Sequence, residues 1–305
     1  MIIWKTAENL KKLKLEVYKL DCYKELSRLS ESNYHIMSTV RSLCRNLSYR
    51  PQALLRKFSD TAPIVYTIEN VAYPRRHKNV ASLNCKTVST LEVAGNPGVY
   101  AVSLNRPSRG NAFNMQMWHE LQDTFQAADT DHSVRAIILT GNSVSFSTGM
   151  DLTVFAEMQK LVAAEPCEGR KREALSNFIQ FLQDAISAPE VCAVPVIAAI
   201  SGHCIGGAVD LITACDLRYC TDNSTFCVKE TDLAMVADIG TLQRLPKLIG
   251  DQQTRELAYT GRTINGIEAQ SLGLVLRSFA TEELMRQHVD EVASAIAKKS
   301  PLTIR

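Results

Sequence analysis

The stretch that decides the fold reads PVIAAISGHCIGGAVD and occupies residues 195–210. Residues 195–200 form a short apolar run with the composition of a buried strand. Gly206 and Gly207 then open a second apolar run that ends near Ala214, which we interpret as a helix. A buried strand that passes through glycines into a helix is typical of an α/β fold with repeated crossovers.

The flanking sequence continues this alternation of strands and helices. Two alternating segments, Lys86–Val93 and Val99–Leu104, enclose a turn that contains glycine, asparagine and proline, which predicts a hairpin. The remaining expected elements are helices over 114–128, 175–189 and most of 251–299, and short buried strands at 136–140 and 217–220.

The composition indicates a globular protein. Apolar residues make up 46% of the 305 residues and charged residues 22%, which excludes disorder as the dominant state. The longest apolar run, 191–200, is about half as long as a membrane-spanning helix. The net charge of +2 gives no argument for a nucleic-acid partner. The nine cysteines contain no CxxC pair, so no zinc signature is present. Five of them lie in one apolar stretch, and we interpret these as reduced core residues of an intracellular protein: Cys192, Cys204, Cys215, Cys220 and Cys227.

The N-terminal region differs from the rest of the chain. Residues 37–59 contain no Asp or Glu but several Arg and Ser residues, which predicts a mitochondrial transit peptide and a location in the matrix. A disordered basic arm is the alternative. Residues 1–36 carry both charges, so they are either an upstream extension before a true start at Met37 or an amphipathic helix that begins at Met1.

Two glycine-containing segments follow predicted strands and are candidates for chemistry. One is Ser147–Leu152 and the other is Gly202–Asp210. Such strand exits expose backbone N–H groups, and two of these groups directed at one oxygen would form an oxyanion hole. Tight packing is the alternative reason for the glycines. Neither segment matches a phosphate-binding loop or a dinucleotide fingerprint.

Three carboxylates form the second candidate feature: Asp210, Glu230 and Asp238. Asp210 is flanked by Val209 and Leu211, and Asp238 stands in the otherwise uncharged segment 233–239. An acid in such surroundings is unfavourable unless it is paired, solvated or protonated. A carboxylate with a raised pKa suits general acid–base catalysis, whereas a helix cap or an ion pair is the structural alternative.

Ordered motifs between Leu104 and Val275 strengthen the catalytic interpretation. They are Asn105-Arg106-Pro107, Asn111-Ala112-Phe113, 146–152, 195–202, Gly206-Gly207-Ala208, 214–219, 240–246 and Thr260-Gly261-Arg262. Together they resemble the enoyl-CoA hydratase/isomerase superfamily, the crotonase family. The resemblance implies an α/β fold, a crotonase-type spiral of ββα units that form two sheets, followed by a helical region.

The acids resemble one branch of that family, the dienoyl-CoA isomerases. The discriminating segments are Val209-Asp210-Leu211, Val228-Lys229-Glu230 and 237–241. Typical hydratases of the family carry Glu in place of Asp210 and Gly in place of Asp238. The resemblance therefore implies a reaction that moves two double bonds of an acyl-CoA from the 3,5 to the 2,4 position.

The resemblance also implies roles for individual residues. The backbone N–H groups of Met150 and Gly207 would hold the thioester oxygen. Glu230 would be the base at C2, Asp238 the acid at C6, and Asp210 would assist Glu230. The residues expected to line the substrate are Ser147, Gly149, Asp151, Leu152 and Gly206. No metal or redox cofactor is expected, because coenzyme A is part of the substrate and no net oxidation occurs.

The domain boundaries are expected at an N-terminal extension of 1–60, a spiral core of 61–262 and a partial helical C-terminal region of 263–305, shorter than in the family. The resemblance implies an acyl-CoA as partner, a homotrimer or homohexamer for the full-length protein, and no nucleic acid.

Two alternatives stay open: a 2-enoyl-CoA hydratase in which Asp210 and Glu230 hold a water, and a non-catalytic crotonase-fold protein that binds RNA or another protein. The peroxisome is the alternative location. The unfamiliar segment 158–172 leaves the acyl chain length open.

Overall fold

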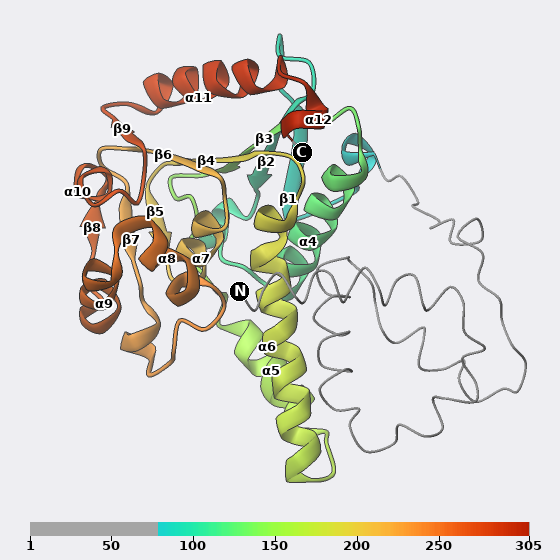
Figure 1. Ribbon diagram of the computed structural model, residues 1–305. Helices are drawn as coiled ribbons and strands as arrows, with labels where there is room; N and C mark the ends of the chain where they lie inside the picture. The colour runs from blue at the N-terminus through green and yellow to red at the C-terminus, as the bar shows by residue number, and fades with distance from the viewer. Residues whose placement is uncertain (1–78, 305) are drawn as a thin grey trace, which may run out of the picture. The chain divides into compact units, whose positions relative to one another are not determined.

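The computed structural model describes residues 79–304, so the predicted transit peptide at 37–59 and the whole 1–60 extension lie outside the described residues. Two sheets organise this part of the chain (Figure 1). The larger sheet has the order β1 (Val88–Glu92), β2 (Val99–Leu104), β3 (Ala136–Gly141), β4 (Val196–Ile200), β6 (Leu217–Thr221) and β9 (Arg277–Phe279). The smaller sheet contains β5 (His203–Ile205), β7 (Thr225–Cys227) and β8 (Ile264–Asn265).

The larger sheet begins as a hairpin and continues as a parallel sheet. β1 and β2 pair antiparallel with Val88 opposite Leu104, and the pairs from β2 through β9 are parallel. Both faces of β3 are buried: Ile137 and Leu139 enter one hydrophobic core, and Ile138 enters the other. Strands buried on both faces require continuous apolar runs, which explains why these strands could be recognised in the sequence. The predicted hairpin and buried strands are confirmed.

Helices cover both faces of the larger sheet. They are α4 (Met115–Thr130), α5 (Thr153–Ala163), α6 (Glu168–Val191), α7 (Gly207–Thr213), α8 (Thr241–Ile249), α9 (Asp251–Thr260), α10 (Gly266–Leu272), α11 (Glu282–Ala297) and α12 (Pro301–Ile304). Short 3-10 turns lie at η3 (Val80–Ser82), η4 (Pro107–Arg109) and η5 (Glu230–Leu233). α11 lies across one face of the sheet (Figure 1), where Met285, Val289 and Ala293 complete the smaller core.

Two of the predicted helices begin at side-chain caps, whereas α6 begins at Glu168, before the predicted start at 175, has no such cap and continues through Pro189 to Val191. The Asn114 side chain accepts a hydrogen bond from the Met117 N–H at 3.0 Å and starts α4. The Thr281 side chain accepts one from the Leu284 N–H and starts α11. α7 begins at Gly207, directly after Gly206, as predicted, and all seven of its residues are buried.

α7 has a central place in the fold. It contacts β5, α6 and α8, and it lies near the middle of Figure 1. The segment after residue 262 joins both sheets, because β8 pairs with β7 and β9 pairs with β6. The boundary expected between 262 and 263 stays a prediction.

Candidate active site

Two strand exits that lie far apart in the sequence are joined by a short parallel bridge. Ser147 follows β3, and its N–H donates to the His203 carbonyl at 2.9 Å. The Ile205 N–H donates to the Ser147 carbonyl at 3.1 Å. The exit that follows β3 and the exit that follows β4 therefore lie side by side, at the carboxyl edge of the parallel strands, where ligands of such sheets commonly bind.

Gly149 allows the two exits to approach closely. Its φ is +86°, and a Cβ added there would lie 2.5 Å from the Ile205 carbonyl oxygen and 3.4 Å from the Gly207 nitrogen. No side chain fits at the first distance, so the glycine is required by backbone packing. The same contact places residue 149 next to the first residue of α7.

The N–H groups of Met150 and Gly207 are available for a ligand. Across residues 79–304, neither group donates a hydrogen bond to protein, although the neighbouring Asp151 N–H donates to the Phe113 carbonyl at 3.1 Å. Backbone N–H groups are usually paired, so two unpaired ones on adjoining segments are unusual. Such a pair could stabilise an oxyanion, as the sequence predicted.

Ser147 acts within the protein scaffold. Its side chain is fully buried, its Oγ donates to the Asn111 carbonyl at 2.9 Å and it accepts from the Gly149 N–H at 3.1 Å. These bonds fix the turn that presents Met150. A direct contact of Ser147 with substrate stays a prediction.

Asp151 and Leu152 have different surroundings from those expected of a substrate-lining pair. The Asp151 carboxylate contacts Arg106 Nη1 at 2.9 Å and accepts from the N–H and hydroxyl of Thr153 at the start of α5. The hydrogen bonds from Thr153 and the Arg106 charge lower the pKa of Asp151. Leu152 is 71% exposed. Substrate contact by either residue stays a prediction.

Asn111 is a residue of the site that sequence reasoning did not select. It is fully buried with a φ of +55°, and its Nδ2 donates to the carbonyls of Ser145 and Phe146 at 2.9 and 3.1 Å. Asn tolerates this left-handed conformation better than most residues. The pair Gly110-Asn111 was the available signal, since both residue types mark such turns.

Asp210 is the most buried of the three acids. Its side chain is 0% exposed, Oδ1 accepts from the Thr241 N–H, and Oδ2 has no partner within residues 79–304. Burial, together with the charge of Glu230, raises the pKa of Asp210 to about 7. At neutral pH this group can therefore either hold or release a proton.

Glu230 is the first residue of η5 and lies beside the second strand exit. A Cβ added to Gly206 would lie 3.4 Å from Glu230 Oε1, whereas Glu230 Oε2 is buried without a hydrogen-bond partner in the described residues. Burial raises the pKa of Glu230, and the charge of Asp238 raises it further. The carboxylate is therefore a better base than an exposed Glu.

Asp238 is exposed to solvent. Its neighbours Ala237 and Ile239 are both buried, so the chain alternates and directs the acid outward. Of the three states that the sequence left open, the structure shows the solvated one. The Asp238 carbonyl accepts from Gln183 Nε2 at 2.8 Å, which ties this segment to α6. The Asp238 charge still reaches Glu230.

Four of the five cysteines interpreted as core residues are buried and free, and the fifth, Cys192, is partly buried. Cys204, Cys215, Cys220 and Cys227 are buried thiols, and burial raises the pKa of Cys215 and of Cys220 to about 12. Such thiols are poor nucleophiles and poor metal ligands at neutral pH. Within residues 79–304, no group of three or more His, Cys, Asp or Glu is arranged to hold a metal.

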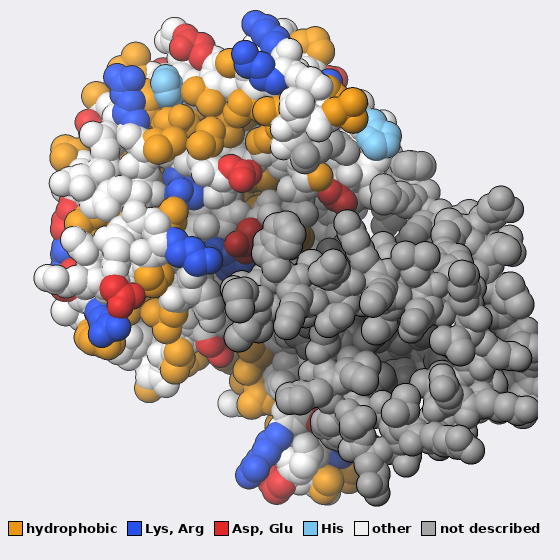
Figure 2. Space-filling view, viewed as in Figure 1, with side chains coloured by type: hydrophobic (Ala, Val, Ile, Leu, Met, Phe, Trp, Pro, Cys, Tyr) orange, Lys and Arg blue, Asp and Glu red, His pale blue; other side chains and the backbone are white. Residues whose placement is uncertain are grey.

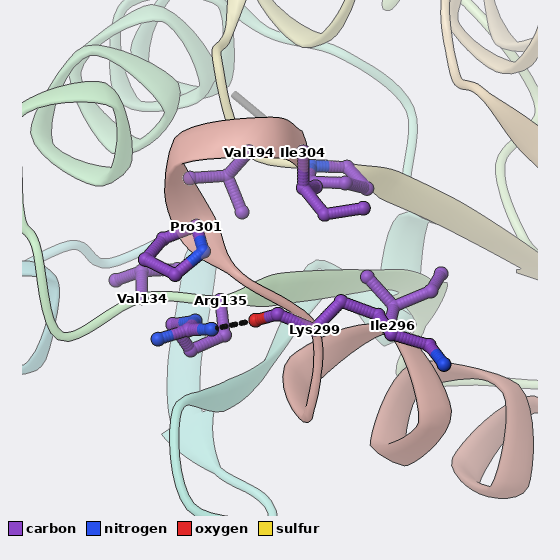
Figure 3. Close-up of a pocket in the computed structure, with 8 residues that line it drawn as sticks. Val134, Arg135, Val194, Ile296, Lys299, Pro301 and Ile304 are labelled. Carbon is purple, nitrogen blue, oxygen red and sulfur yellow. Dashed lines mark hydrogen bonds between the residues drawn. The ribbon is translucent and has the colours of Figure 1, made fainter.

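A small cavity lies at the opposite edge of the larger sheet (Figure 3). It measures about 10 Å³, room for about one water molecule. Its lining includes Val134 and Arg135, just before β3, and Val194, just before β4. The Arg135 side chain donates to the Lys299 carbonyl across it. This cavity is therefore separate from the acids, which lie near the strand exits.

Comparisons with known proteins agree with this geometry. The family model described as Enoyl-CoA hydratase/isomerase matches residues 94–305. A peroxisomal Delta(3,5)-Delta(2,4)-dienoyl-CoA isomerase of Arabidopsis thaliana is 41% identical over 219 residues, 72% of this chain and 79% of that protein. The mitochondrial protein of the same name from Rattus norvegicus is 41% identical over 210 residues, 68% of this chain and 63% of that protein. The chain thus spans less than two thirds of the rat relative.

Solved structures of hydratases share the fold. A Bacillus anthracis enoyl-CoA hydratase is similar with a TM-score of 0.62 and 31% identity, covering 72% of this chain and 80% of that one. A putative enoyl-CoA hydratase from Thermobifida fusca, solved in complex with acetoacetyl-CoA, gives a TM-score of 0.62 and 29% identity, covering 72% and 83%. Among the helices of residues 79–304, none has the length and apolar character needed to cross a membrane.

Proposed function

Because the chain belongs to the enoyl-CoA hydratase/isomerase family, we propose that it converts 3,5-dienoyl-CoA to 2,4-dienoyl-CoA in fatty-acid β-oxidation. The observation that carries the proposal is the arrangement of acids. The buried Asp210 and the partly buried Glu230 lie beside two unpaired backbone N–H groups, and a third acid, Asp238, lies close enough to act on Glu230.

The two N–H groups supply the electrostatic part of the reaction. A thioester carbonyl acidifies its α-carbon, and removal of that proton places negative charge on the thioester oxygen. The N–H groups of Met150 and Gly207 would donate to this oxygen, since neither is used within the described protein. Loss of one such donor typically raises a barrier by about 3 kcal/mol.

The acids divide the proton transfers between the two ends of the diene. Glu230 removes the proton at C2, because its raised pKa makes it an effective base. Asp238 delivers a proton at C6, a carbon too far from C2 for one carboxylate to serve both easily. Asp210 assists by adjusting the proton affinity of Glu230. The acids interact, so they titrate as a coupled group.

No metal or redox cofactor enters this proposal, because the isomerisation only moves protons and coenzyme A arrives as part of the substrate. The substrate-lining roles of Ser147, Gly149, Asp151, Leu152 and Gly206 belong to the same proposal. Gly149 and Gly206 are the best supported, since both adjoin the candidate catalytic groups.

The second candidate function is hydration of a 2-enoyl-CoA. It is favoured by Asp210 and Glu230, which together could hold a water, and by the hydratase names of the solved structures. A parallel assay with 3,5-dienoyl-CoA and 2-enoyl-CoA separates the two by absorbance. We expect a conjugated product from the first substrate at least tenfold faster than turnover of the second. Turnover of the 2-enoyl-CoA alone would establish the hydratase, and inactivity on both would favour the non-catalytic class.

The proposed location is the mitochondrial matrix, with the peroxisome as the alternative. The relatives are named mitochondrial in the rat and peroxisomal in the plant. Sequencing the N-terminus of protein isolated from its cells should find a start between residues 59 and 63 if the predicted presequence is removed. An intact Met1 would contradict the mitochondrial assignment.

The proposed assembly is a homotrimer or homohexamer of the full-length protein. Large apolar side chains remain exposed on the described surface, and Figure 2 shows several gathered near its upper edge, where α11 lies in Figure 1. Exposed apolar patches commonly mark interfaces. Light scattering on the full-length protein would test this, and a monomer would contradict it.

A further inference from the structure

The first turn of α8 is connected directly to the buried acid. The Thr241 N–H donates to Asp210 Oδ1, whereas Asp210 Oδ2 has no partner within residues 79–304. The position of this acid therefore depends on how firmly the start of α8 is held.

Arg244, one turn into α8, holds that start in place. Its guanidinium lies against Gly240 so closely that a Cβ at Gly240 would overlap it, and Ile186 Cγ2 of α6 would lie 3.3 Å from that Cβ. A Cβ at residue 240 would therefore displace the guanidinium from its place.

Arg244 is itself anchored to α6. Nε and Nη2 both donate to Glu190 Oε2, at 2.8 and 2.5 Å, and Nη2 also donates to Ser187 Oγ at 2.8 Å. The Arg244 side chain is only 12% exposed. An arginine that donates through several nitrogens in a confined place has one well-defined orientation.

We propose that Arg244 is a positioning residue of the acid site, which holds the start of α8 against Asp210 and places a fixed cation near the Asp210–Glu230 pair. This inference rests on the proposed function. A cation is useful there because two neighbouring carboxylates repel each other, and the charge of Glu230 raises the pKa of Asp210. The Arg244 charge opposes the effects of burial and of Glu230 and lowers the pKa of Asp210.

Other charged or titratable groups also face Asp210. Glu230 reaches it from η5, Arg244 reaches it from α8, and Cys204 of β5 lies close enough to be affected by the Asp210 charge. On α6, Glu190 faces Arg244. The neutral thiol of Cys204 contributes no charge near pH 7, since burial raises its pKa well above the usual value.

Two substitutions at Arg244 separate charge from geometry. Arg244→Met removes the cation, so protons should bind the acid pair more tightly. The acid limb of the kcat/KM profile should then move up by about one pH unit, a tenfold loss of rate on that limb. Arg244→Lys keeps the cation, so its acid limb should stay in place while kcat falls equally at every pH. Arg255→Met, which removes an exposed cation that pairs with Asp251 on α9, should match the wild type.

Glu190→Gln should shift the acid limb of the kcat/KM profile in the opposite direction, and it leaves Arg244 itself unchanged. It removes the negative charge that faces the guanidinium, so the acid limb should move to lower pH. An acid limb of folded Arg244→Met that coincides with the wild-type limb would overturn the proposal, as would equal shifts in Arg244→Met and Arg244→Lys. If Arg244→Met does not fold, a shift of the acid limb to higher pH in Glu190→Gln would also overturn the proposal.

A titration that needs no turnover separates this inference from the proposed function. With carboxyl-¹³C aspartate in the full chain, the Asp210 signal is assigned by its loss in Asp210→Asn. Its midpoint should rise in Arg244→Met and stay in place in Arg244→Lys. An inactive wild type that shows these shifts would reject only the proposed function. An active wild type whose midpoint is the same in both variants would reject only the role of Arg244.

Discussion

Asp210 and Asp238 lie in two regions that differ in solvent exposure: the first acid is buried and the second is exposed. Asp210 belongs to α7, in which every residue is buried, and its carboxylate receives one backbone N–H. Asp238 belongs to the segment between η5 and α8, where Val236 is 66% exposed and the acid itself faces solvent. Burial therefore changes the proton affinity of Asp210, whose pKa it raises to about 7.

This difference suits a reaction with proton transfer at both ends of a conjugated chain. An acid in contact with solvent can recover a proton from water after each transfer. A buried acid retains its proton or its charge until a neighbouring group changes. Glu230 lies between these extremes, because it is partly exposed yet has one buried, unpaired oxygen.

The largest effect is expected at Glu230. Glu230→Gln removes the proposed base while its shape stays nearly the same, so isomerisation of 3,5-dienoyl-CoA should fall by about 10³–10⁴-fold. Exchange of the C2 proton with solvent should be lost as well. Steady-state assays measure the first and deuterium uptake the second. Glu256→Gln, an exposed partner of Arg262, is the matched control and should stay near the wild-type rate.

The next effect is expected at Asp238. Asp238→Asn should lower isomerisation by about 10²-fold, because the proton at C6 then has no dedicated donor. The melting temperature should stay within about 2 °C of the wild type, since the carboxylate is exposed and makes no described side-chain hydrogen bond. A wild-type rate in this variant would remove the two-acid mechanism and favour the hydratase.

The contrast between the two acids was only partly visible in the sequence. Asp210 stands in a run of apolar residues with helical spacing, and burial of every residue in that helix follows from its place against β5, α6 and α8. Asp238 stands in a similarly apolar run, yet it is exposed because this part of the run is irregular and its side chain points outward between the buried residues Ala237 and Ile239. Composition cannot distinguish these cases, because exposure in an irregular segment depends on tertiary contacts.

A smaller effect, on stability, is expected at Asp210. The carboxylate loses its proton near pH 3.8 in the unfolded chain but near pH 7 in the folded protein, so folding binds a proton between these values. The free energy of unfolding should therefore decrease as the pH rises from 4 to 7. Relative to Asp210→Asn, the wild type should gain roughly 2–3 kcal/mol when the pH falls from 7.5 to 5.

Urea unfolding of both proteins at each pH measures this difference. Glu230 also has a raised pKa, so Asp210→Asn should be compared with Asp210→Asn/Glu230→Gln to separate the two contributions. The Asp210 pKa is not raised if the stability difference between the wild type and Asp210→Asn is the same at pH 7.5 and at pH 5.

The smallest effect is expected at Asp151, on the same strand exit as Met150. Asp151→Asn weakens a half-buried pair with Arg106 and should cost about 1–2 kcal/mol of stability. The pKa of Asp151 is lowered, so the contribution is complete above the unfolded value of 3.8 and is lost as the pH falls below it. Asp251→Asn, in the exposed pair with Arg255, should change stability by less than about 0.5 kcal/mol. Equal losses in both variants would contradict this difference.

The strand exits also contain some features that could be predicted from the sequence and others that could not. The glycines and the unpaired N–H groups could be predicted, because positive φ values and strand–helix junctions have local signals. The three-residue strands β5 and β7 were not predicted, because segments this short have no periodicity. The Arg106–Asp151 pair and the anchor of Arg244 on Glu190 join residues 45 and 54 positions apart, which local patterns do not relate.

The most direct test of the two-acid account is the ratio of C2 proton exchange to isomerisation in Asp238→Asn. The variant and the wild type are incubated with 3,5-dienoyl-CoA in D₂O, and mass spectrometry follows deuterium at C2 of recovered substrate alongside product formation. The account predicts that exchange persists in the variant while isomerisation falls about 10²-fold, so the ratio rises by a similar factor, because Glu230 still forms the dienolate and returns the proton to C2. If exchange and isomerisation fall together, one group serves both carbons and the account is contradicted.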